Sequence, residues 1–375
     1  MTGLALFRHA AFAVPIALCL GCGVTEGGID AGYVWQLPVG FPTPKVPAEN
    51  PMSDAKVNLG RRLFYDPRLS LSQARACASC HVQALGFTSP TPKGPGLEHP
   101  TQRNVIALAV PAYASTYLWA DPACTSIEDV IEQTMLDQNE FGGAGNEATI
   151  VQRLGADTTY ARLFKEAFPG ESISFGTISK GIASFVRTII SGDTPYDRYT
   201  RGDLWALSSE ARRGMDLFFS EKTECYHCHS GFTFSGSVSH AGLAVSAVTF
   251  SNTGLYDLDG RGAYPAEDRG LLEMTGQIAD MGRFKAPTLR NIAKTAPYMH
   301  DGSMATLREV IDSYIAGGRS ALDGGAPSPA CDSLITRRLS YGPLTEEEVS
   351  DLVAFLESLT DESFLSDPRY SNPLQ

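Results

Sequence analysis

The chain has 375 residues, of which 43% are hydrophobic and 19% are charged, and its formal net charge is −12. A chain of this length and apolar content can bury the cores of two domains of ordinary size. The acidic balance argues against nucleic acid or an anionic membrane surface as a partner, and weakly favours a basic or neutral protein.

The first residues are typical of an export signal. Arg8 and His9 form a short polar start, and residues 10–20 form an apolar run that is too short to span a bilayer. Cys22 follows where a lipoprotein signal would be processed. We therefore predict a signal peptide over residues 1–21, a periplasmic location and a lipid anchor at Cys22 as the one membrane contact. The alternative is a Cys of no special role near a cleaved signal.

Three segments organise the first half of the chain. Residues 22–50 are rich in Gly and Pro without apolar periodicity, which predicts a flexible tether. Ser53 is placed to cap a first helix. A long helix is predicted over residues 174–190, and turn residues after it suggest that the N-terminal domain covers residues 51–206.

The chain contains the pattern C-x-x-C-H twice. Cys77, Cys80 and His81 form the first copy, and the second copy lies 148 residues later. It consists of Cys225, Cys228 and His229. At this spacing two thiols add to the vinyl groups of a haem and the His ligates its iron. A disulfide or half of a zinc site is the alternative, but a zinc ribbon needs further paired ligands, and the other cysteines stand alone. The sequence therefore predicts two covalently bound haems.

Similar apolar helices precede the two haem motifs. Residues 60–65 lead into the first motif, and residues 214–219 lead into the second, 154 positions later. This match indicates a duplicated cytochrome c unit.

The second half is also expected to be helical. Ser208 is placed to cap a helix, and Thr345 begins a capping box before an amphipathic helix. Residues 240–281 are rich in Gly, Ser, Thr and Asp, which predicts a long ordered loop. Strand signals are almost absent. We predict a mainly α fold of two tandem c-type cytochrome domains, the second over residues 207–375.

Together these motifs resemble the bacterial di-haem cytochrome c peroxidase and MauG superfamily over about residues 50–360. Besides the haem motifs, the resemblance depends on residues 284–291 and 295–302. Residues 252–257 and 280–284 look closest to the MbnH-like branch, whose members oxidise a partner protein encoded beside them. The resemblance implies a first, peroxidatic haem and a second, electron-transfer haem.

The resemblance gives Tyr314 a specific role. It lies 14 positions after His300, where ordinary peroxidases have the Met that ligates the second haem and MauG-like enzymes have a Tyr. A thioether ligand raises a haem potential, whereas an oxygen donor stabilises oxidised iron. A haem held by His229 and Tyr314 would be suited to sharing a high oxidation state. The alternatives are a core tyrosine or ligation by a nearby Met.

Two more residues are assigned by resemblance. Trp119, 38 positions after His81, stands where the family has a Trp that carries electrons between the haems, with core packing as the alternative. Glu140 stands where the family has a carboxylate that moves protons on bound peroxide. The preceding residues depart from the family pattern, so Glu132 is a rival and an exposed loop charge is the alternative.

The resemblance also implies an inter-domain calcium site. The side chain of Asn104 and the carbonyl oxygens of Thr295 and Pro297 match its ligands, although these residue types are common in loops. In some members a loop His blocks the first iron at rest, and His99 is the His in that loop. We interpret His99 as a surface residue.

Cys124 and Cys331 remain after the haem and lipid cysteines are assigned. In an oxidising compartment a disulfide between the two halves is one option, and the distance between them decides it.

Three functions remain open. The leading hypothesis is an exported di-haem oxidoreductase that reacts with hydrogen peroxide and oxidises a periplasmic or cell-surface protein. The second is a conventional cytochrome c peroxidase that takes electrons from a small cytochrome. The third is a di-haem electron carrier without catalysis, which requires six ligands on both irons.

Overall fold

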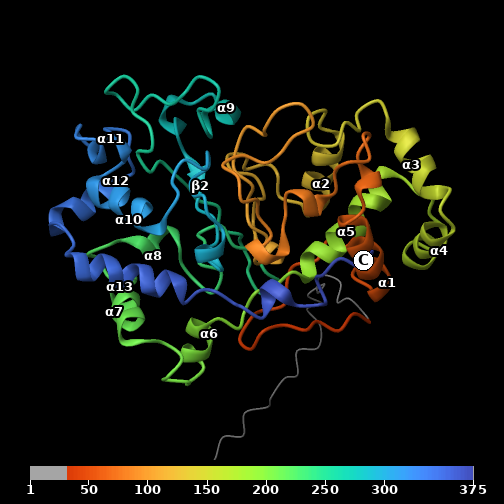
Figure 1. Ribbon diagram of the computed structural model, residues 1–375, viewed down its shortest axis with the longest axis horizontal. Coiled ribbons are helices and arrows are strands. Elements are labelled where there is room, and N and C mark those ends of the chain that lie inside the picture. The colour runs from red at the N-terminus through yellow and green to blue at the C-terminus, as the bar shows by residue number, and fades with distance from the viewer. Residues whose placement is uncertain (1–31, 375) are drawn as a thin grey trace, which may run out of the picture.

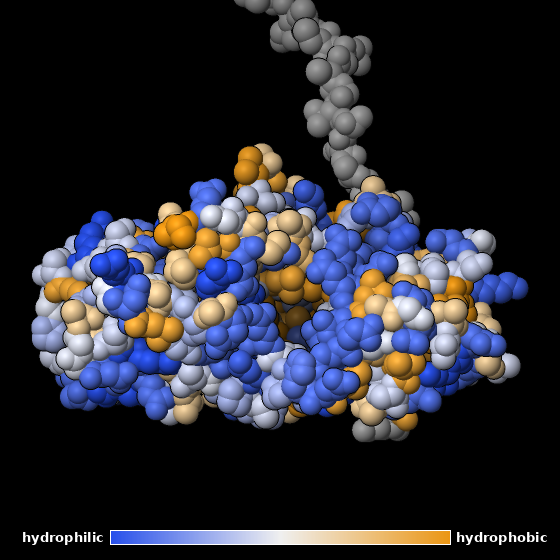
Figure 2. Space-filling view, turned by 90° about the horizontal axis from the view of Figure 1, so that it is seen from above, coloured by the Kyte–Doolittle hydropathy of each residue, from blue (hydrophilic) through white to orange (hydrophobic). Residues whose placement is uncertain are grey.

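The computed structural model describes residues 32–374, so the predicted signal peptide and the lipid site at Cys22 lie outside the described residues. The chain forms two lobes, with the first half on the right of Figure 1 and most of the second half on the left. From above, the surface is hollowed between the lobes, and hydrophobic residues gather around the hollow (Figure 2). Among the helices of residues 32–374, none combines the length and apolar character needed to span a membrane.

The described chain is mainly helical, as predicted. The helices of the first lobe are α1 (Asp54–Phe64), α2 (Ile127–Leu136), α3 (Glu147–Gly155), α4 (Thr158–Ala167) and α5 (Phe175–Thr188). Helix α6 (Pro195–Thr200) follows them. The helices of the second lobe are α7 (Ser209–Phe218), α8 (Cys225–Cys228), α9 (Leu272–Thr275), α10 (Leu307–Ala316), α11 (Arg319–Leu322), α12 (Ser333–Arg338) and α13 (Glu346–Glu357). The regular strands of the described residues are β1 (Phe250–Ser251) and β2 (Phe284–Lys285), which pair antiparallel.

The helix starts follow from local capping. Ser53 accepts a hydrogen bond from the backbone N–H of Lys56 at the start of α1, and Ser208 caps α7 in the same way. Thr345 forms the predicted capping box with Glu348 before α13. These side chains satisfy backbone donors that a helix leaves unpaired at its N-terminus.

In the first lobe, α1 crosses α5 at a glycine. A Cβ on Gly60 would lie 1.9 Å from the carbonyl oxygen of Gly181, so the two backbones can approach this closely only without that side chain. One turn further along, the rings of Phe64 and Phe185 pack with centroids 5.3 Å apart. The crossing brings α1 against α5 directly ahead of the first haem motif.

The second lobe repeats this crossing with α7 and α13. A Cβ on Gly214 would lie 1.9 Å from the carbonyl oxygen of Asp351, and the rings of Phe218 and Phe355 are 5.1 Å apart. Gly214 and Phe218 each lie 154 positions after their counterparts in α1, as predicted for a duplicated unit.

The C-terminal residues do not stay with the second lobe. Phe364 and Tyr370 are buried in the hydrophobic cluster of the first lobe, and the chain ends beside α1 (Figure 1). The predicted extent of the second domain, residues 207–375, is therefore wrong at its end. The predicted boundary near residue 206 stays a prediction.

Residues 32–50 are packed against both lobes, so the prediction of a flexible tether is wrong over this part. The ring of Phe41 lies 5.9 Å from that of Tyr113 and 4.9 Å from that of Phe232. Asn50 is fully buried and donates to Glu128 at 2.6 Å. Gly and Pro content indicated irregular backbone correctly, but it does not show what the aromatic side chains between them contact.

A buried ion pair joins the segment between the lobes to the second lobe. Arg290 is 1% exposed and donates from two nitrogens to the carboxylate of Asp197 in α6, at 2.8 and 2.9 Å. Its Nε donates to the carbonyl oxygen of Phe232 at 2.7 Å, and its guanidinium lies 4.9 Å from the ring centre of Phe41. One side chain thus connects four segments that are distant in sequence.

The glycine crossings generate a stability test. We expect Gly60→Ala and Gly214→Ala each to lower the free energy of unfolding by about 1–3 kcal/mol, because the new methyl group overlaps a backbone carbonyl. Gly176→Ala in α5 is the control, since its Cβ would meet no atom closer than 3.8 Å. This control should be neutral or stabilising, by up to about 1 kcal/mol from helix propensity. Denaturant unfolding that gave all three variants the stability of the natural protein would contradict this account of the crossings.

Candidate functional site

Each predicted haem motif opens onto its own cavity. The first cavity, of about 400 Å³, is lined by Cys77, Cys80 and His81 together with Trp119 and Glu140. The second, of about 230 Å³, is lined by Cys225, Cys228 and His229 together with Trp119 and Tyr314. The structure therefore brings the sequence-predicted residues together in two groups that share Trp119.

Both predicted iron ligands are held by backbone carbonyls. The Nδ1 atom of His81 lies 2.8 Å from the carbonyl oxygen of Phe87, and Nδ1 of His229 lies 3.1 Å from that of Pro287 and 3.2 Å from that of Phe234. A carbonyl oxygen can only accept, so Nδ1 carries the proton and Nε2 keeps the lone pair that a metal needs. Burial lowers the pKa of both imidazoles, against the opposing effect of these bonds, which favours the neutral ligand form.

Two of the three residues that supply these carbonyls, one in each copy, share an unusual backbone conformation. Phe87 has φ +61° and Phe234 has φ +50°, in the left-handed region that bulky residues seldom adopt. The same conformation at the equivalent place in both copies indicates that the loops are shaped to aim a carbonyl at the His.

The four motif cysteines are half-buried free thiols. Burial raises the pKa of Cys77 to about 12, and that of Cys80 and of Cys225 to about 11. None of the four is in a disulfide, and none belongs to a metal-binding group of three His, Cys, Asp or Glu side chains within the described residues. The disulfide and zinc alternatives therefore find no support, whereas two thiols and a neutral imidazole in one cavity fit a haem.

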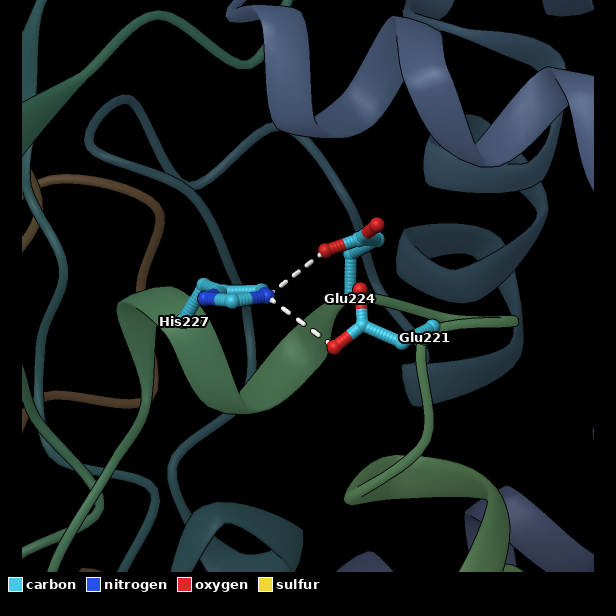
Figure 3. Close-up of side chains that lie close together, drawn as sticks. All are labelled: Glu221, Glu224 and His227. Atoms are coloured by element: carbon cyan, nitrogen blue, oxygen red, sulfur yellow. Dashed lines mark ion pairs between the residues drawn. The ribbon is translucent and has the colours of Figure 1, made fainter.

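Among the described residues, one cluster of potential metal ligands is found, at the start of the second motif, formed by Glu221, Glu224 and His227 (Figure 3). Glu224 is buried, with His227 Nε2 2.8 Å from one carboxylate oxygen. Arg337 donates to both oxygens of that carboxylate at 2.8 Å. Since a guanidinium already neutralises Glu224, the cluster is a set of ion pairs that fixes the turn before Cys225.

Tyr314 is placed by α10 in the cavity of His229. Its neighbours Val310 and Ile311 pack in hydrophobic clusters, but Tyr314 belongs to none of the clusters formed by the described residues. No hydrogen bond to its hydroxyl is found among those residues either. Burial raises the pKa of its phenol, with smaller contributions from the nearby Cys228 and Cys225. These observations favour a ligand over a core residue, although Met299 lines the same cavity.

Trp119 is fixed where the two cavities adjoin. Its Nε1 donates to the carbonyl oxygen of Asn104 at 2.7 Å, and its own carbonyl accepts from the backbone N–H of Lys285 at 2.8 Å. Trp119 also packs against a hydrophobic cluster that includes Phe284 and Tyr298. Trp119 therefore packs in a hydrophobic cluster and also lies between the two candidate haem sites.

Glu140, and not Glu132, lines the first cavity with His81. Burial raises the pKa of Glu140 to about 7, with a smaller contribution from the negative charge of Asp137. The backbone N–H of Glu140 donates to Asp137 at 2.8 Å, which fixes the turn that carries the carboxyl group. A carboxyl group that titrates near neutrality can both accept and return a proton.

The three residues of the predicted calcium site all line the second cavity. The side-chain Nδ2 of Asn104 lies 3.3 Å from the carbonyl oxygen of Pro297, and Thr295 is two residues before it. The side chain of Asn104 and the backbone of Pro297 are thus adjacent in space, joined by a hydrogen bond from the amide NH2 group.

Other predicted residues lie elsewhere. His99 is exposed and lies outside both sets of lining residues, so it does not block the first cavity. Cys124 and Cys331 are both buried free thiols, so the disulfide that the sequence left open is not formed.

Two site residues were missed by the sequence analysis. Lys285 lines both cavities and Arg338 lines the second, and both are buried. Lys285 lies within residues 284–291, which carry the family resemblance, and this position could have identified it as a candidate site residue. Arg338 follows another Arg at the end of a helix, a pattern that favours a solvated cation at the helix C-terminus.

Comparison with known proteins agrees with this geometry. Residues 54–204 match the family described as di-haem cytochrome c peroxidase. The chain is 33% identical to cytochrome-c peroxidase IdrP1 of Denitromonas iodatirespirans, over 96% of this chain and 97% of that protein. It is 32% identical to the methylamine utilization protein MauG of Methylorubrum extorquens, over 93% of this chain and 92% of that protein.

Solved structures agree as well. The crystal structure of a MauG-like protein associated with microbial copper homeostasis superposes with a TM-score of 0.86 at 43% identity, covering 92% of this chain and 100% of that one. At 18% identity, the diheme peroxidase BthA from Burkholderia thailandensis shares the fold, with a TM-score of 0.65. The chain therefore belongs to the di-haem cytochrome c peroxidase and MauG family and is a peroxidase-type oxidoreductase.

Proposed function

We propose that this enzyme reacts with hydrogen peroxide and oxidises a partner protein by long-range electron transfer. The observation that carries the proposal is Tyr314 in the cavity of His229, without a packing cluster or a hydrogen-bond partner among the described residues. The 43% identity to a MauG-like protein supports it. Relatives named cytochrome-c peroxidase are similar at 33% identity, so the conventional peroxidase is the second candidate.

Two haems c are the proposed cofactors, attached through Cys77 and Cys80 in the first cavity and through Cys225 and Cys228 in the second. When bound, the haems supply the redox chemistry with peroxide. The protein holds them through His81 and the equivalent His of the second motif, each with its Nδ1 proton committed to a carbonyl oxygen.

Glu140 is the proposed proton carrier. Reduction of hydrogen peroxide to two waters consumes two electrons and two protons, and the partner protein supplies the electrons. The carboxylate of Glu140 takes a proton from one peroxide oxygen and returns it to the leaving oxygen. Its raised pKa places both forms within reach near neutral pH.

Trp119 is the proposed route for electrons between the cavities. The indole is large and oxidisable, and its position is set by hydrogen bonds from both its ring nitrogen and its carbonyl oxygen. Because Trp119 lines both cavities, the second site can supply electrons while peroxide stays in the first. The partner protein then does not need to enter the peroxide pocket.

Tyr314 is proposed to ligate the second iron through its phenol oxygen. An oxygen donor stabilises oxidised iron, whereas the Met of a conventional peroxidase stabilises reduced iron. The tyrosine thus favours oxidation of a partner over the collection of electrons from a small cytochrome.

Export, a periplasmic location and a lipid anchor at Cys22 complete the proposal. They follow from the sequence before residue 32, and haem attachment at C-x-x-C-H is consistent with them. The net charge of −12 favours a neutral or basic protein as the partner.

One Ca²⁺ is proposed between the lobes, bound by Asn104, Thr295 and Pro297. Calcium accepts neutral amide and carbonyl oxygens together with waters. The carbonyl oxygen of Asn104 also accepts from Trp119, so the ion would stabilise the residue that holds the indole.

The first prediction concerns Glu140. The rate of reaction with peroxide should rise with pH through about 7, because the carboxylate is the form that accepts the proton. Glu140→Gln should lower this rate by about 10²–10⁴-fold and abolish the pH step. Stopped-flow measurement on either side of neutrality tests this. The control is Glu132→Gln, which should keep both the rate and the step. A Gln variant at Glu140 that retained the step would remove Glu140 from the mechanism.

The second prediction concerns Tyr314 and decides between the two candidate functions. Tyr314→Met should raise the reduction potential of the second haem, since a thioether favours ferrous iron. Oxidation of the protein partner should fail, and reduction by a small cytochrome should become easier. The exposed Tyr341→Met is the control. If the potential and the peroxide-treated spectrum of the Tyr314 variant both match those of the natural protein, the conventional peroxidase is the better assignment.

The third prediction concerns calcium. Exhaustive chelation should disturb the haem spectra and lower turnover, because the ligands join the lobes beside Trp119. Added Ca²⁺ should restore both, whereas Mg²⁺ should not, since it requires a tighter octahedral shell. Spectra and turnover that survive chelation unchanged would show that the site is absent or unimportant.

A further inference from the structure

Lys285 is a buried cation without an acidic partner. Lys285 is 6% exposed. It lines both cavities, and no other charged side chain of the described residues does so. Its Nζ donates to the carbonyl oxygen of Thr116 at 2.8 Å, and none of the ion pairs of the described residues includes it. Burial lowers the pKa of Lys285 to about 8.

Arg338 is a second such cation, in the second cavity only. It is 4% exposed and lines this cavity with Cys225 and Tyr314. One of its nitrogens donates to the carbonyl oxygen of Ile315. Its Nε and Nη1 are buried and have no hydrogen-bond partner among the described residues, and no ion pair of those residues includes it. The guanidinium therefore presents unpaired donors in the cavity region.

Two neighbouring arginines, unlike Lys285 and Arg338, form ion pairs with carboxylates of the protein. Arg103, which lines the first cavity, pairs with Asp268 at 2.7 Å. Arg337, adjacent to Arg338 in α12, pairs with the carboxylate of Glu224 at 2.6 Å. Lys285 and Arg338 differ from both in having no carboxylate.

A buried cation is costly unless a counter-charge and hydrogen bonds compensate it. The residues packed around Lys285 and Arg338 offer carbonyl oxygens, which compensate only in part. The missing negative charge must therefore come from a group that enters the cavities. Haem c carries two carboxylate side chains, and thioether formation at the vinyl groups leaves both free.

We propose that Lys285 and Arg338 are the counter-charges for haem carboxylates, Lys285 where the two cavities adjoin and Arg338 in the second cavity alone. The inference rests on haem binding in both cavities and is independent of the peroxide and partner chemistry. Because Lys285 lines both cavities, it is assigned to both haems, whereas Arg338 is assigned to the second haem alone.

This assignment has a measurable consequence for the reduction potentials. An unpaired carboxylate stabilises the ferric iron, which carries one more positive charge than the ferrous iron. A cation that neutralises the carboxylate removes this stabilisation and raises the potential. Loss of Arg338 should therefore lower the potential of the second haem only, and loss of Lys285 should lower both.

The test is a redox titration of the holoprotein without peroxide or partner, with each haem followed by its own ferric electron paramagnetic resonance signal. We expect Arg338→Met to change the ferric-to-ferrous ratio of the second haem by about tenfold or more at a fixed potential, which is about 59 mV for one electron. Lys285→Met should shift both haems in the same direction. The charge-retaining variants Arg338→Lys and Lys285→Arg should stay close to the natural protein.

Two exposed residues provide controls of equal charge. Arg308→Met in α10 and Lys294→Met remove side chains that are 43% and 39% exposed, where solvent screens the charge. Both should leave the potentials unchanged. Unshifted potentials in haem-loaded Arg338→Met and Lys285→Met would overturn the proposal, as would equal shifts in the charge-retaining variants.

Failure to load haem is also informative. If Arg338→Met does not retain the second haem and Arg338→Lys does, the charge is needed to hold the cofactor, which supports the proposal. If both variants lose it, Arg338 acts through packing and the proposal is wrong. None of these outcomes depends on whether the enzyme oxidises a protein or a small cytochrome.

Discussion

The buried pair of Arg290 and Asp197 holds the segment between the two lobes against the second lobe. Asp197 also forms the capping box of α6 with Thr194. One carboxylate therefore stabilises the start of α6 and binds Arg290 in the segment after β2. Burial alone would raise the pKa of Asp197, but the hydrogen bonds and charge of Arg290 outweigh it and hold the pKa below its usual range. The stabilisation is therefore present above the unfolded pKa of the carboxyl group and is lost as pH falls through the folded one. Removal of either partner would leave a buried charge uncompensated, which is more costly than loss of an exposed pair.

The two lobes repeat the same helix crossing and haem-motif loop, but their cavities differ in other side chains. Both lobes use a glycine crossing to bring two helices together, and both aim a left-handed Phe carbonyl at the Nδ1 of a His. These features belong to holding a haem and are shared. The rest of the lining differs between the cavities, because the first includes Glu140 and the second includes Tyr314. In the proposed mechanism the carboxyl group of Glu140 transfers protons and the phenol oxygen of Tyr314 ligates an oxidised iron. The proposed difference between the sites therefore depends on side chains outside the repeated helices and loops.

The sequence predicted those parts of the site whose chemistry fixes their spacing. The haem motifs depend on covalent geometry, and the caps at Ser53, Ser208 and Thr345 depend on local hydrogen bonds, so neighbouring residues were sufficient to find them. Burial and pairing depend on distant segments. Lys285 and Arg338 could not be identified as unpaired cations because that requires knowing which acids are absent from their surroundings. Residues 32–50 were mistaken for a tether because composition does not reveal that Phe41 lies against Arg290.

The last residues of the chain have a consequence for how the protein matures. The rings of Phe364 and Tyr370 lie 5.6 and 6.3 Å from that of Phe87, the residue whose carbonyl oxygen holds His81. Gln83, in the same loop, donates to the carbonyl oxygen of Asp367 at 2.9 Å. The end of the chain thus completes the packing around the first haem motif, which is nearly 300 residues away in sequence. During synthesis the first lobe can complete its native packing only after the final segment of the chain has been made, so the two halves mature as one unit even though each carries its own haem motif.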